Sequence, residues 1–136
     1  INVEPSGLPD WYESRWKTYK SIYTVPSNTI NVLYGSHSLE HVQNIDKFIN
    51  ELKRILMPNG IMFWEVPNGD YETNGAKNGK VDIPHTYYFK KAFFDYLFEE
   101  VILNEGFEQS HRHEKIENWA KFKNPNGEVL RAIGRF

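Results

Sequence analysis

The chain has 136 residues, a length that suits one domain built around a single hydrophobic core. It contains no cysteine, which excludes disulfide bonds, thiolate catalysis and cysteine-ligated metal centres. The formal net charge is −2 with both signs interspersed, so the sequence offers no electrostatic surface for nucleic acid or an anionic membrane. No apolar run approaches the length of a membrane span and no signal peptide is visible. We therefore expect a cytoplasmic domain with neither a nucleic-acid nor a membrane partner.

The N-terminal part of the chain is expected to hold a short strand, a helix and a turn. Residues 1–5 favour a β-strand that Pro5 ends. Asp10, with Glu13 three residues later, is typical of a capping box at the start of a helix. That helix would carry aromatic side chains at helical spacing, namely Tyr12, Trp16 and Tyr19. Residues 26–28 predict a turn.

The middle of the chain predicts a strand, a helix and a second strand. Residues 29–34 are β-branched and apolar and stop at Gly35, which predicts a buried strand. Residues 44–57 repeat apolar side chains along one helical face, at Ile45, Phe48, Ile49, Leu52, Ile55 and Leu56. A turn at 58–60 and a buried strand at 61–66 follow. This order with short connections is the parallel unit of an α/β sheet, so the predicted fold class is α/β.

The C-terminal half predicts a lid, a helix and a hairpin. Residues 69–84 are polar and glycine-rich and too long for a mere connector, and we expect them to cover an active site. An amphipathic helix is expected over 90–104, with Gly106 as its C-terminal stop. The remaining residues predict an antiparallel hairpin over 107–136 around a turn at 124–127.

Residues 37–41 read His-Ser-Leu-Glu-His, the H-x-x-E-H pattern in which two histidines bind zinc and the glutamate activates water. A zinc site of this kind needs both histidines on one face of a helix, together with a third ligand. His37 follows Gly35 by only two residues, so we expect it in the turn between strand and helix. No residue is singled out as a third ligand. A zinc hydrolase is therefore a remote alternative, and no metal is expected.

Polar residues follow both predicted parallel strands. The first strand is followed by Ser36, His37, Ser38, Glu40 and His41, and the second by Pro67 and Asn68. In an open α/β sheet, ligands bind outside the carboxyl ends of the strands. The two groups therefore predict a binding crevice at one edge of the sheet.

Four segments follow one another along the chain: NVLYGSHSLEHV (31–42), FINELKRILMPNGIMFWEVPN (48–68), PHTYYF (84–89) and GF (106–107). In this order and spacing they resemble the class I, Rossmann-like S-adenosylmethionine-dependent methyltransferases, most closely the branch that often acts on small molecules and sugars. The resemblance covers nearly the whole chain. It implies a single methyltransferase-like domain over 1–136, a three-layer αβα sandwich with an incomplete methyltransferase sheet and a C-terminal antiparallel hairpin.

The resemblance also implies S-adenosylmethionine as cofactor and the residues that contact it. An acidic residue at the end of the family's second strand binds the ribose hydroxyls, and Glu4 occupies that place. The implied cofactor-binding residues are Glu4, Gly35, Ser36, His37, Ser38, Glu40 and His41. The implied substrate-binding residues are Pro67, Asn68, His85, Tyr87 and Tyr88.

Methyl transfer is an in-line displacement, in which proximity and alignment supply most of the acceleration. An acceptor hydroxyl must also lose its proton, and histidine is suited to accept it near neutral pH. His85, which follows the expected lid, is the first candidate for this catalytic role, and His37 is the second.

The family's first strand and glycine-rich loop have no counterpart in the sequence, and the chain begins at Ile1, which predicts a fragment of a longer protein. Three functions stay open. One is methyl transfer to a small-molecule or sugar-type acceptor. Another is a degenerate, non-catalytic methyltransferase-like scaffold or binding module. The last is the zinc hydrolase.

Overall fold

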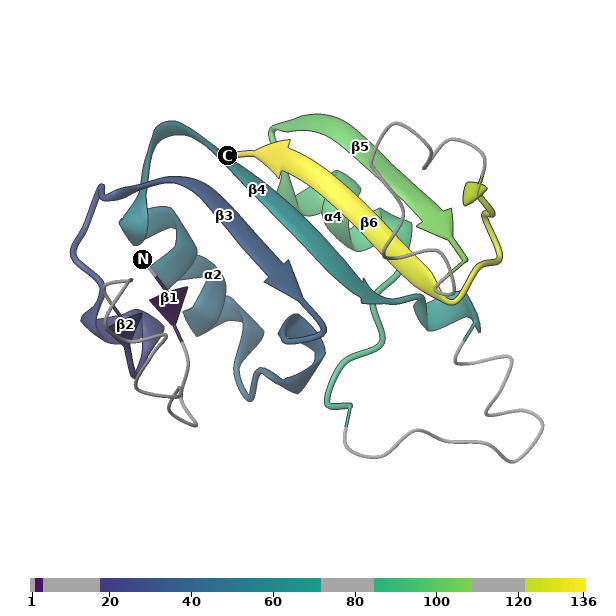
Figure 1. The fold of residues 1–136 in the computed structure, drawn as a ribbon, viewed down its shortest axis with the longest axis horizontal. Coiled ribbons are helices and arrows are strands. Elements are labelled where there is room, and N and C mark those ends of the chain that lie inside the picture. Colours follow the sequence, from purple (N-terminus) through teal and green to yellow (C-terminus); the bar gives the residue numbers. More distant parts are fainter. Residues whose placement is uncertain (1, 4–17, 72–84, 109–121) are drawn as a thin grey trace.

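The computed structural model describes residues 2–3, 18–71, 85–108 and 122–136. A four-stranded sheet forms its centre, with the strand order β3-β4-β6-β5 (Figure 1). These strands are β3 (Ile30–Ser36), β4 (Leu56–Pro67), β5 (Glu100–Phe107) and β6 (Val129–Arg135). β3 and β4 are parallel, whereas β6 is antiparallel to both β4 and β5.

The N-terminal residues contribute a separate pair of short parallel strands. They are β1 (Asn2–Val3) and β2 (Thr18–Tyr19). The expected strand at residues 1–5 is thus found as β1. Tyr19, however, lies in β2, so its assignment to a helix was wrong, because strand pairing overrode the local aromatic spacing. The predicted helix start at Asp10 lies outside the described residues.

Two α-helices cover one face of the sheet, α2 (Ile45–Ile55) and α4 (Lys91–Leu97) (Figure 1). Phe48 of α2 meets Trp64 of β4 edge-on, with 6.2 Å between ring centroids. Phe98, which caps α4, lies where a Cβ at Gly134 of β6 would be. The core fills this interface, and its apolar members include Leu39, Leu52, Ile55, Met62, Trp64, Val66, Phe94, Leu97, Leu130 and Ala132. No helix among the described residues is long and apolar enough to cross a membrane.

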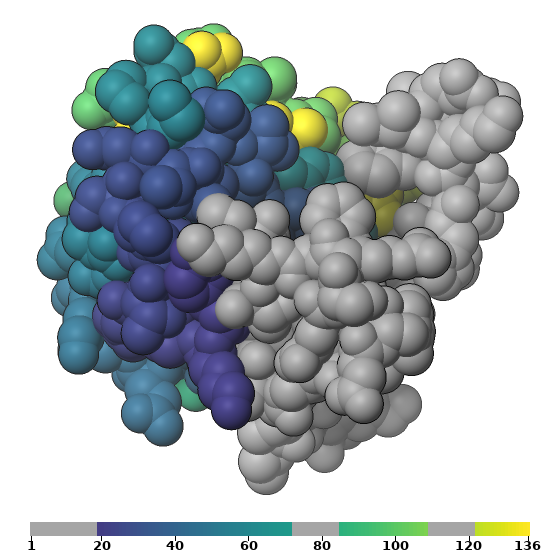
Figure 2. Space-filling model, turned by 60° about the vertical axis from the view of Figure 1, so that its left-hand side comes forward, coloured from purple at the N-terminus to yellow at the C-terminus, as the bar shows by residue number. Residues whose placement is uncertain are grey.

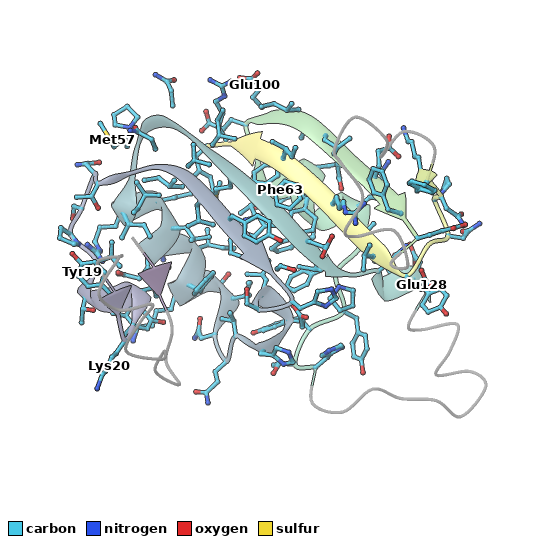
Figure 3. The ribbon with its side chains drawn as sticks, viewed as in Figure 1. Tyr19, Lys20, Met57, Phe63, Glu100 and Glu128 are labelled. Carbon is cyan, nitrogen blue, oxygen red and sulfur yellow. The ribbon has the colours of Figure 1, made fainter. Side chains whose placement is uncertain are left out.

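The opposite face of the sheet carries apolar side chains that the described helices do not cover. Val32 and Tyr34 of β3 are 70% and 68% exposed. Tyr34 stacks on Phe63 of the neighbouring strand at 5.1 Å between ring centroids. Figure 3 labels Phe63 near the middle of the sheet. The predicted three-layer sandwich is therefore seen as two layers within the described residues, a truncated Rossmann-like arrangement.

The predicted parallel unit is confirmed, with one change at its second connection. Val32 pairs with Ile61 and Ser36 with Glu65, and α2 crosses between the two strands. The helix ends at Ile55, however, and β4 begins at the next residue. The expected turn at 58–60 lies inside β4 as an irregularity.

The helix expected over 90–104 is wrong in its second half. α4 ends at Leu97, and the chain continues as β5, which contains Gly106. Phe93, Phe94, Leu97 and Phe98 have helical spacing, yet the following residues form a ladder with β6. The Asn104 side chain reinforces this by donating to the Lys91 carbonyl and to Asp95 Oδ1, both at 2.8 Å. Pairing between distant segments outweighs the local pattern here.

The expected hairpin is confirmed as antiparallel pairing of the last strand, but its bounds differ. Its first strand is β5, which begins at Glu100 and not at residue 107. The turn is found where expected: the Gly127 N–H donates to the Asn124 carbonyl at 2.8 Å. Residues 109–121 lie outside the described residues. β6 lies between β4 and β5, so β5 is the edge strand.

One ion-pair cluster ties β5 to its neighbours and makes stability depend on pH. Lys123 Nζ donates to Glu105 at 2.8 Å, and Lys91 Nζ lies 3.3 Å from the same carboxylate. The hydrogen bond from Lys123, helped by Lys91, lowers the pKa of Glu105 below its usual value of 4.5. A carboxyl whose folded pKa is depressed stabilises the fold above its unfolded pKa, and this contribution is lost as pH falls through the folded pKa.

We therefore expect Glu105→Gln to lower the free energy of unfolding by about 0.5–1 kcal/mol near neutral pH. The difference should vanish as the pH falls below the depressed pKa of Glu105, where the wild-type carboxyl is protonated too. Urea unfolding across the acid range measures this, with exposed Glu99→Gln as the control. A difference that persists unchanged in acid would contradict it.

Candidate functional site

The turn after β3 has an unusual backbone that places two histidines and a glutamate together. His37 has a φ of 46°, in the left-handed region that non-glycine residues seldom adopt. Its N–H donates to the Glu65 carbonyl at 2.9 Å, which fixes the turn to β4. The short 3-10 helix η2 (Leu39–His41) follows at once. The expectation that His37 lies in the turn is confirmed.

This geometry does not form the zinc-peptidase arrangement. His37 lies before η2, whereas His41 is its last residue. The two side chains therefore do not share a helical face one turn apart, as H-x-x-E-H zinc binding requires. The motif instead supplies separate side chains to a crevice.

Gly35 is required by the packing under this turn. It pairs with Trp64 of β4, and a Cβ at this position would overlap the Trp64 ring. A glycine lets the indole lie directly against the β3 backbone, just before the chain turns. The turn after β3 therefore begins directly beside the Trp64 ring.

Glu40 is buried without the hydrogen bonds that a carboxylate needs. Its side chain is 1% exposed, and neither oxygen accepts a hydrogen bond from any residue that the structure describes. The approaching nitrogens are His37 Nδ1 at 3.5 Å and His41 Nε2 at 3.9 Å from Oε1. Burying a carboxylate costs several kcal/mol unless a positive charge or donors compensate it.

Residues 85–87 are fastened to the same turn by backbone hydrogen bonds. The N–H groups of Thr86 and Tyr87 both donate to the Glu40 carbonyl, at 2.8 and 3.2 Å. The Tyr87 hydroxyl accepts from the Ile45 N–H at 3.3 Å at the start of α2. These bonds bring His85 beside His41, with 5.1 Å between ring centroids.

Glu40, His41 and His85 thus form one group, called here the Glu–His–His cluster. One ligand atom of each lies within 4.8 Å of those of the other two. Glu40 is buried, His85 is half-buried and His41 is exposed, so the cluster opens to solvent on one side.

Glu65 is a second buried carboxylate near the turn after β3, and hydrogen bonds and an ion pair compensate its charge. It accepts from Arg131 Nε at 2.8 Å and from the Ser36 hydroxyl at 3.1 Å. Ser36, Glu65 and Arg131 are direct partners across β3, β4 and β6, so their side chains point to the same face. Arg131 is fully buried, and its guanidinium lies 4.8 Å from the centroid of the Phe107 ring.

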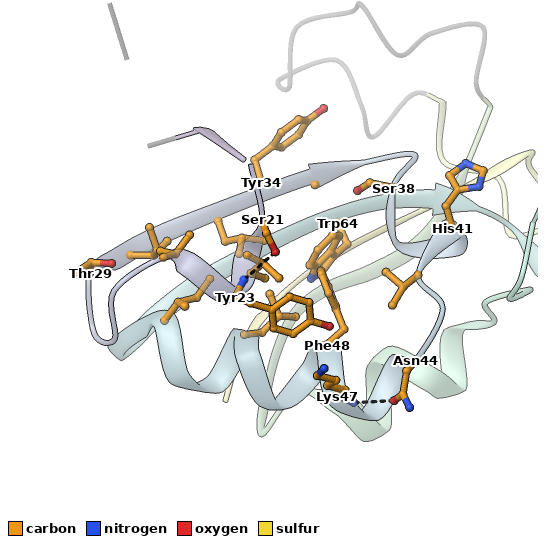
Figure 4. A pocket seen from close by; sticks show the side chains of 18 of the residues that line it. Ser21, Tyr23, Thr29, Tyr34, Ser38, His41, Asn44, Lys47, Phe48 and Trp64 are labelled. Carbon is orange, nitrogen blue, oxygen red and sulfur yellow. Dashed lines mark hydrogen bonds between the residues drawn. The ribbon is translucent and has the colours of Figure 1, made fainter. Parts of the chain in front are cut away.

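An open groove of about 1190 Å³ runs along β3 and past the start of α2 (Figure 4). Figure 2 shows, in purple to blue, the side of the molecule to which the segment from β2 to α2 contributes. Its walls are apolar, with Val25, Phe48, Leu52, Ile55 and Trp64. Its polar end lies where β3 stops and includes Gly35, His37, Ser38, His41 and Asn44. Figure 4 shows Ser38 and His41 at this end of the strand. Of the two groups of polar residues predicted to form a crevice, the one after β3 contributes to this groove, whereas Pro67 and Asn68 do not line it.

The structure does not bring all predicted site residues together. Pro67 and Asn68 follow β4, but the Asn68 side chain is buried and donates to the Gly127 carbonyl at 2.9 Å. Its amide thus holds the turn at 124–127. Tyr88 is exposed, with its ring 6.4 Å from that of His85. Glu4 and residues 72–84 of the expected lid lie outside the described residues.

Glu65 and Arg131 were missed by the sequence analysis. Glu65 is the single charged residue of β4, and Arg131 interrupts the apolar run Val-Leu-Arg-Ala-Ile of β6. A lone charge in a buried strand is a signal for a paired partner on the next strand, because an unpaired charge there is too costly.

A parallel strand–helix–strand unit with a groove outside the strand end is typical of α/β domains that bind nucleotide-type cofactors. Residues 3–131 match the model of a family described as a methyltransferase domain, and the chain belongs to this family. The predicted class I methyltransferase family is thereby confirmed. These findings support S-adenosylmethionine as the cofactor.

Solved structures of low sequence identity share the fold. The crystal structure of a SAM-dependent methyltransferase from Archaeoglobus fulgidus superposes with a TM-score of 0.57 at 19% identity, over 91% of this chain and 69% of that chain. A complex of the Haloferax volcanii Trm112 methyltransferase activator with a methyltransferase gives 0.54 at 13% identity, over 82% and 56%. The small RNA methyltransferase HEN1 gives 0.61 at 14% identity, over 98% of this chain but 19% of that chain. No curated protein sequence matches the chain.

The Glu65–Arg131 pair gives a stability prediction. Arg131→Met keeps the apolar stem but leaves the Glu65 charge buried without its partner, so we expect a loss of about 3–5 kcal/mol in the free energy of unfolding. Denaturant unfolding measures this. The matched control is Arg135→Met on the same strand, whose partner Glu100 is exposed. That variant should cost at most about 1 kcal/mol. Equal effects of the two variants would contradict the assignment.

Proposed function

We propose that this methyltransferase domain takes part in methyl transfer from S-adenosylmethionine to a hydroxyl group of a small-molecule or sugar-type acceptor. The observation that carries the proposal is the groove along β3, whose polar end is lined by His37 and His41. The buried carboxylate of Glu40 precedes His41 in the same turn. Its volume of about 1190 Å³ is large enough for a cofactor and leaves room beside it.

The cofactor would lie at the polar end of the groove, against the turn after β3. Gly35, Ser36, His37 and Ser38 would border it there, with Glu40 and His41 supporting the turn from below. Glu4 would bind the ribose hydroxyls. Bound at this place, S-adenosylmethionine supplies a methyl group that its sulfonium sulfur has already activated.

The acceptor would approach from the side of residues 85–88. Its hydroxyl proton must leave as the oxygen takes the methyl carbon and the sulfur departs as a neutral thioether. We assign contact with this hydroxyl to His85 in preference to His37. The ring nitrogens of His37 face two carboxylates, with Nδ1 3.5 Å from Glu40 and Nε2 3.7 Å from Glu65. His85 lies across the crevice beside His41 and Tyr88.

We expect His85→Ala to lower turnover by about a hundredfold to ten-thousandfold while the affinity for cofactor stays nearly unchanged. His85→Gln should be about as slow, because glutamine keeps a hydrogen bond but can neither accept the proton nor replace the imidazole. S-adenosylhomocysteine release from a panel of hydroxyl-bearing small molecules and sugars is the measurement. Tyr96→Ala, at a position that is 90% exposed on α4, should leave the rate unchanged. An active Gln variant would make His85 structural.

A binding experiment separates an enzyme from a degenerate scaffold. The family's glycine-rich loop supplies backbone N–H groups to the cofactor, and the sequence contains no glycine-rich motif of this kind. We therefore expect calorimetry to detect weak or no binding of S-adenosylmethionine to this chain, and clear binding to a longer protein that supplies the loop. Micromolar affinity of the chain alone would show that the pocket is misplaced. A longer protein with the loop but no cofactor binding would favour the scaffold.

A further inference from the structure

We infer that the Glu–His–His cluster binds a divalent first-row transition-metal ion, such as Mn²⁺, Co²⁺ or Zn²⁺. The ligands are one carboxylate oxygen of Glu40 and one imidazole nitrogen each from His41 and His85. The binding site stands on the geometry of these residues alone. The role of the ion in methyl transfer rests on the proposed function.

The three donor atoms are already close to a ligand geometry. They lie within 4.8 Å of one another. Nitrogen and oxygen ligands about 2.1 Å from a shared ion lie roughly 3–3.5 Å apart, so small side-chain rotations would close the site. No rearrangement of the backbone is required.

Glu40 supplies an independent reason for a cation at this place. It is 1% exposed and accepts no hydrogen bond from the described residues. Glu65, which also lies near His37, is comparably buried, but Arg131 and Ser36 compensate its charge. Among the described residues, no arginine or lysine forms an ion pair with Glu40. A divalent ion bound by His41 and His85 would supply the missing positive charge.

Backbone hydrogen bonds and a neighbouring histidine hold the proposed ligands in place. Thr86 and Tyr87 donate to the carbonyl of the residue whose side chain is the carboxylate ligand, so His85 and Glu40 move as a unit. His37 Nδ1, 3.5 Å from Glu40 Oε1, lies in position to orient the carboxylate. His37 in turn reaches Glu65 at 3.7 Å, which links the cluster to the buried ion pair.

The donor set selects the class of ion. Two imidazoles and one carboxylate suit Mn²⁺, Fe²⁺, Co²⁺ or Zn²⁺, whereas Mg²⁺ and Ca²⁺ prefer oxygen ligands throughout. Three protein ligands leave coordination positions open, and the exposed side of His41 gives solvent access to them. Such an arrangement would leave room for a further ligand on the ion, and the inference differs here from the expectation of a site without metal.

Within the proposed function, the ion would bind the acceptor's hydroxyl oxygen and lower its pKa. The proton would pass to solvent water, the oxygen would form its bond to the methyl carbon, and the carbon–sulfur bond would break to release the neutral thioether. His85 would then act as a ligand and not as a base. This explains why a histidine that faces the acceptor also lies against a buried carboxylate.

The test measures metal binding without cofactor or acceptor. The chain is stripped with a chelator and titrated with Mn²⁺, followed by electron paramagnetic resonance, and with Zn²⁺, followed by calorimetry. One equivalent should bind. Loss of contacts that merely orient a metal ligand costs about 10- to 100-fold in affinity, so Glu40→Gln and His85→Ala should each weaken binding by at least about 100-fold. Glu99→Gln, the same substitution at an exposed position, should leave affinity unchanged.

Thermal melts provide a second readout with a defined sign. Glu40→Gln removes an uncompensated buried charge, so in chelator this variant should melt no lower than the wild type. Added Mn²⁺ should raise the midpoint of the wild type and leave that of the variant unchanged. Absence of stoichiometric binding, or wild-type affinity in both variants, would overturn the inference. Methyl transfer that survives full chelation would remove the ion's role in the reaction while leaving the site itself intact.

Discussion

The parallel pairing of β3 with β4 is the constraint on which the rest of the structure depends. It places the carboxyl ends of both strands at one edge, so the turn at 37–41 lies beside Glu65. The pairing is close because Gly35 lies flat against Trp64, and it is continued into the turn by the hydrogen bond from His37 to the Glu65 carbonyl. The positive φ at His37 is the local cost of turning the chain within so few residues.

Glu40 and Glu65 are both buried and both lie near His37, but their surroundings differ. This difference indicates a structural role for Glu65 and a ligand-binding role for Glu40. Glu65 belongs to the sheet, where Arg131 neutralises it across the strand pair and Phe107 packs on the guanidinium. Glu40 belongs to the turn and meets histidines whose own ring nitrogens remain 3.5 Å or more away. A charge that the fold compensates stabilises the fold, whereas one that the fold leaves uncompensated is available to a ligand.

Local patterns in the sequence were sufficient to predict the parallel strand–helix–strand unit. The apolar repeat of α2 and the β-branched run before Gly35 are each formed by residues close together in the sequence. The local patterns failed at 98–104, where aromatic helical spacing competes with pairing to β6, a contact between distant segments. The HSLEH turn was placed correctly because it follows a strand directly. The meeting of His85 with Glu40 was not predictable, since it depends on two backbone hydrogen bonds across more than forty residues. The same holds for Glu65 and Arg131, whose contact depends on strand register.

The central claim is that methyl transfer takes place at the carboxyl end of β3. A crystal structure with S-adenosylhomocysteine bound, solved for a protein that contains this chain together with a glycine-rich loop of the family, tests it most directly. The account predicts that the ligand lies along the turn at residues 35–38, with its sulfur facing the crevice that holds Glu40, His41 and His85. A ligand bound elsewhere, for example on the α4 and β5 side of the sheet, would contradict it.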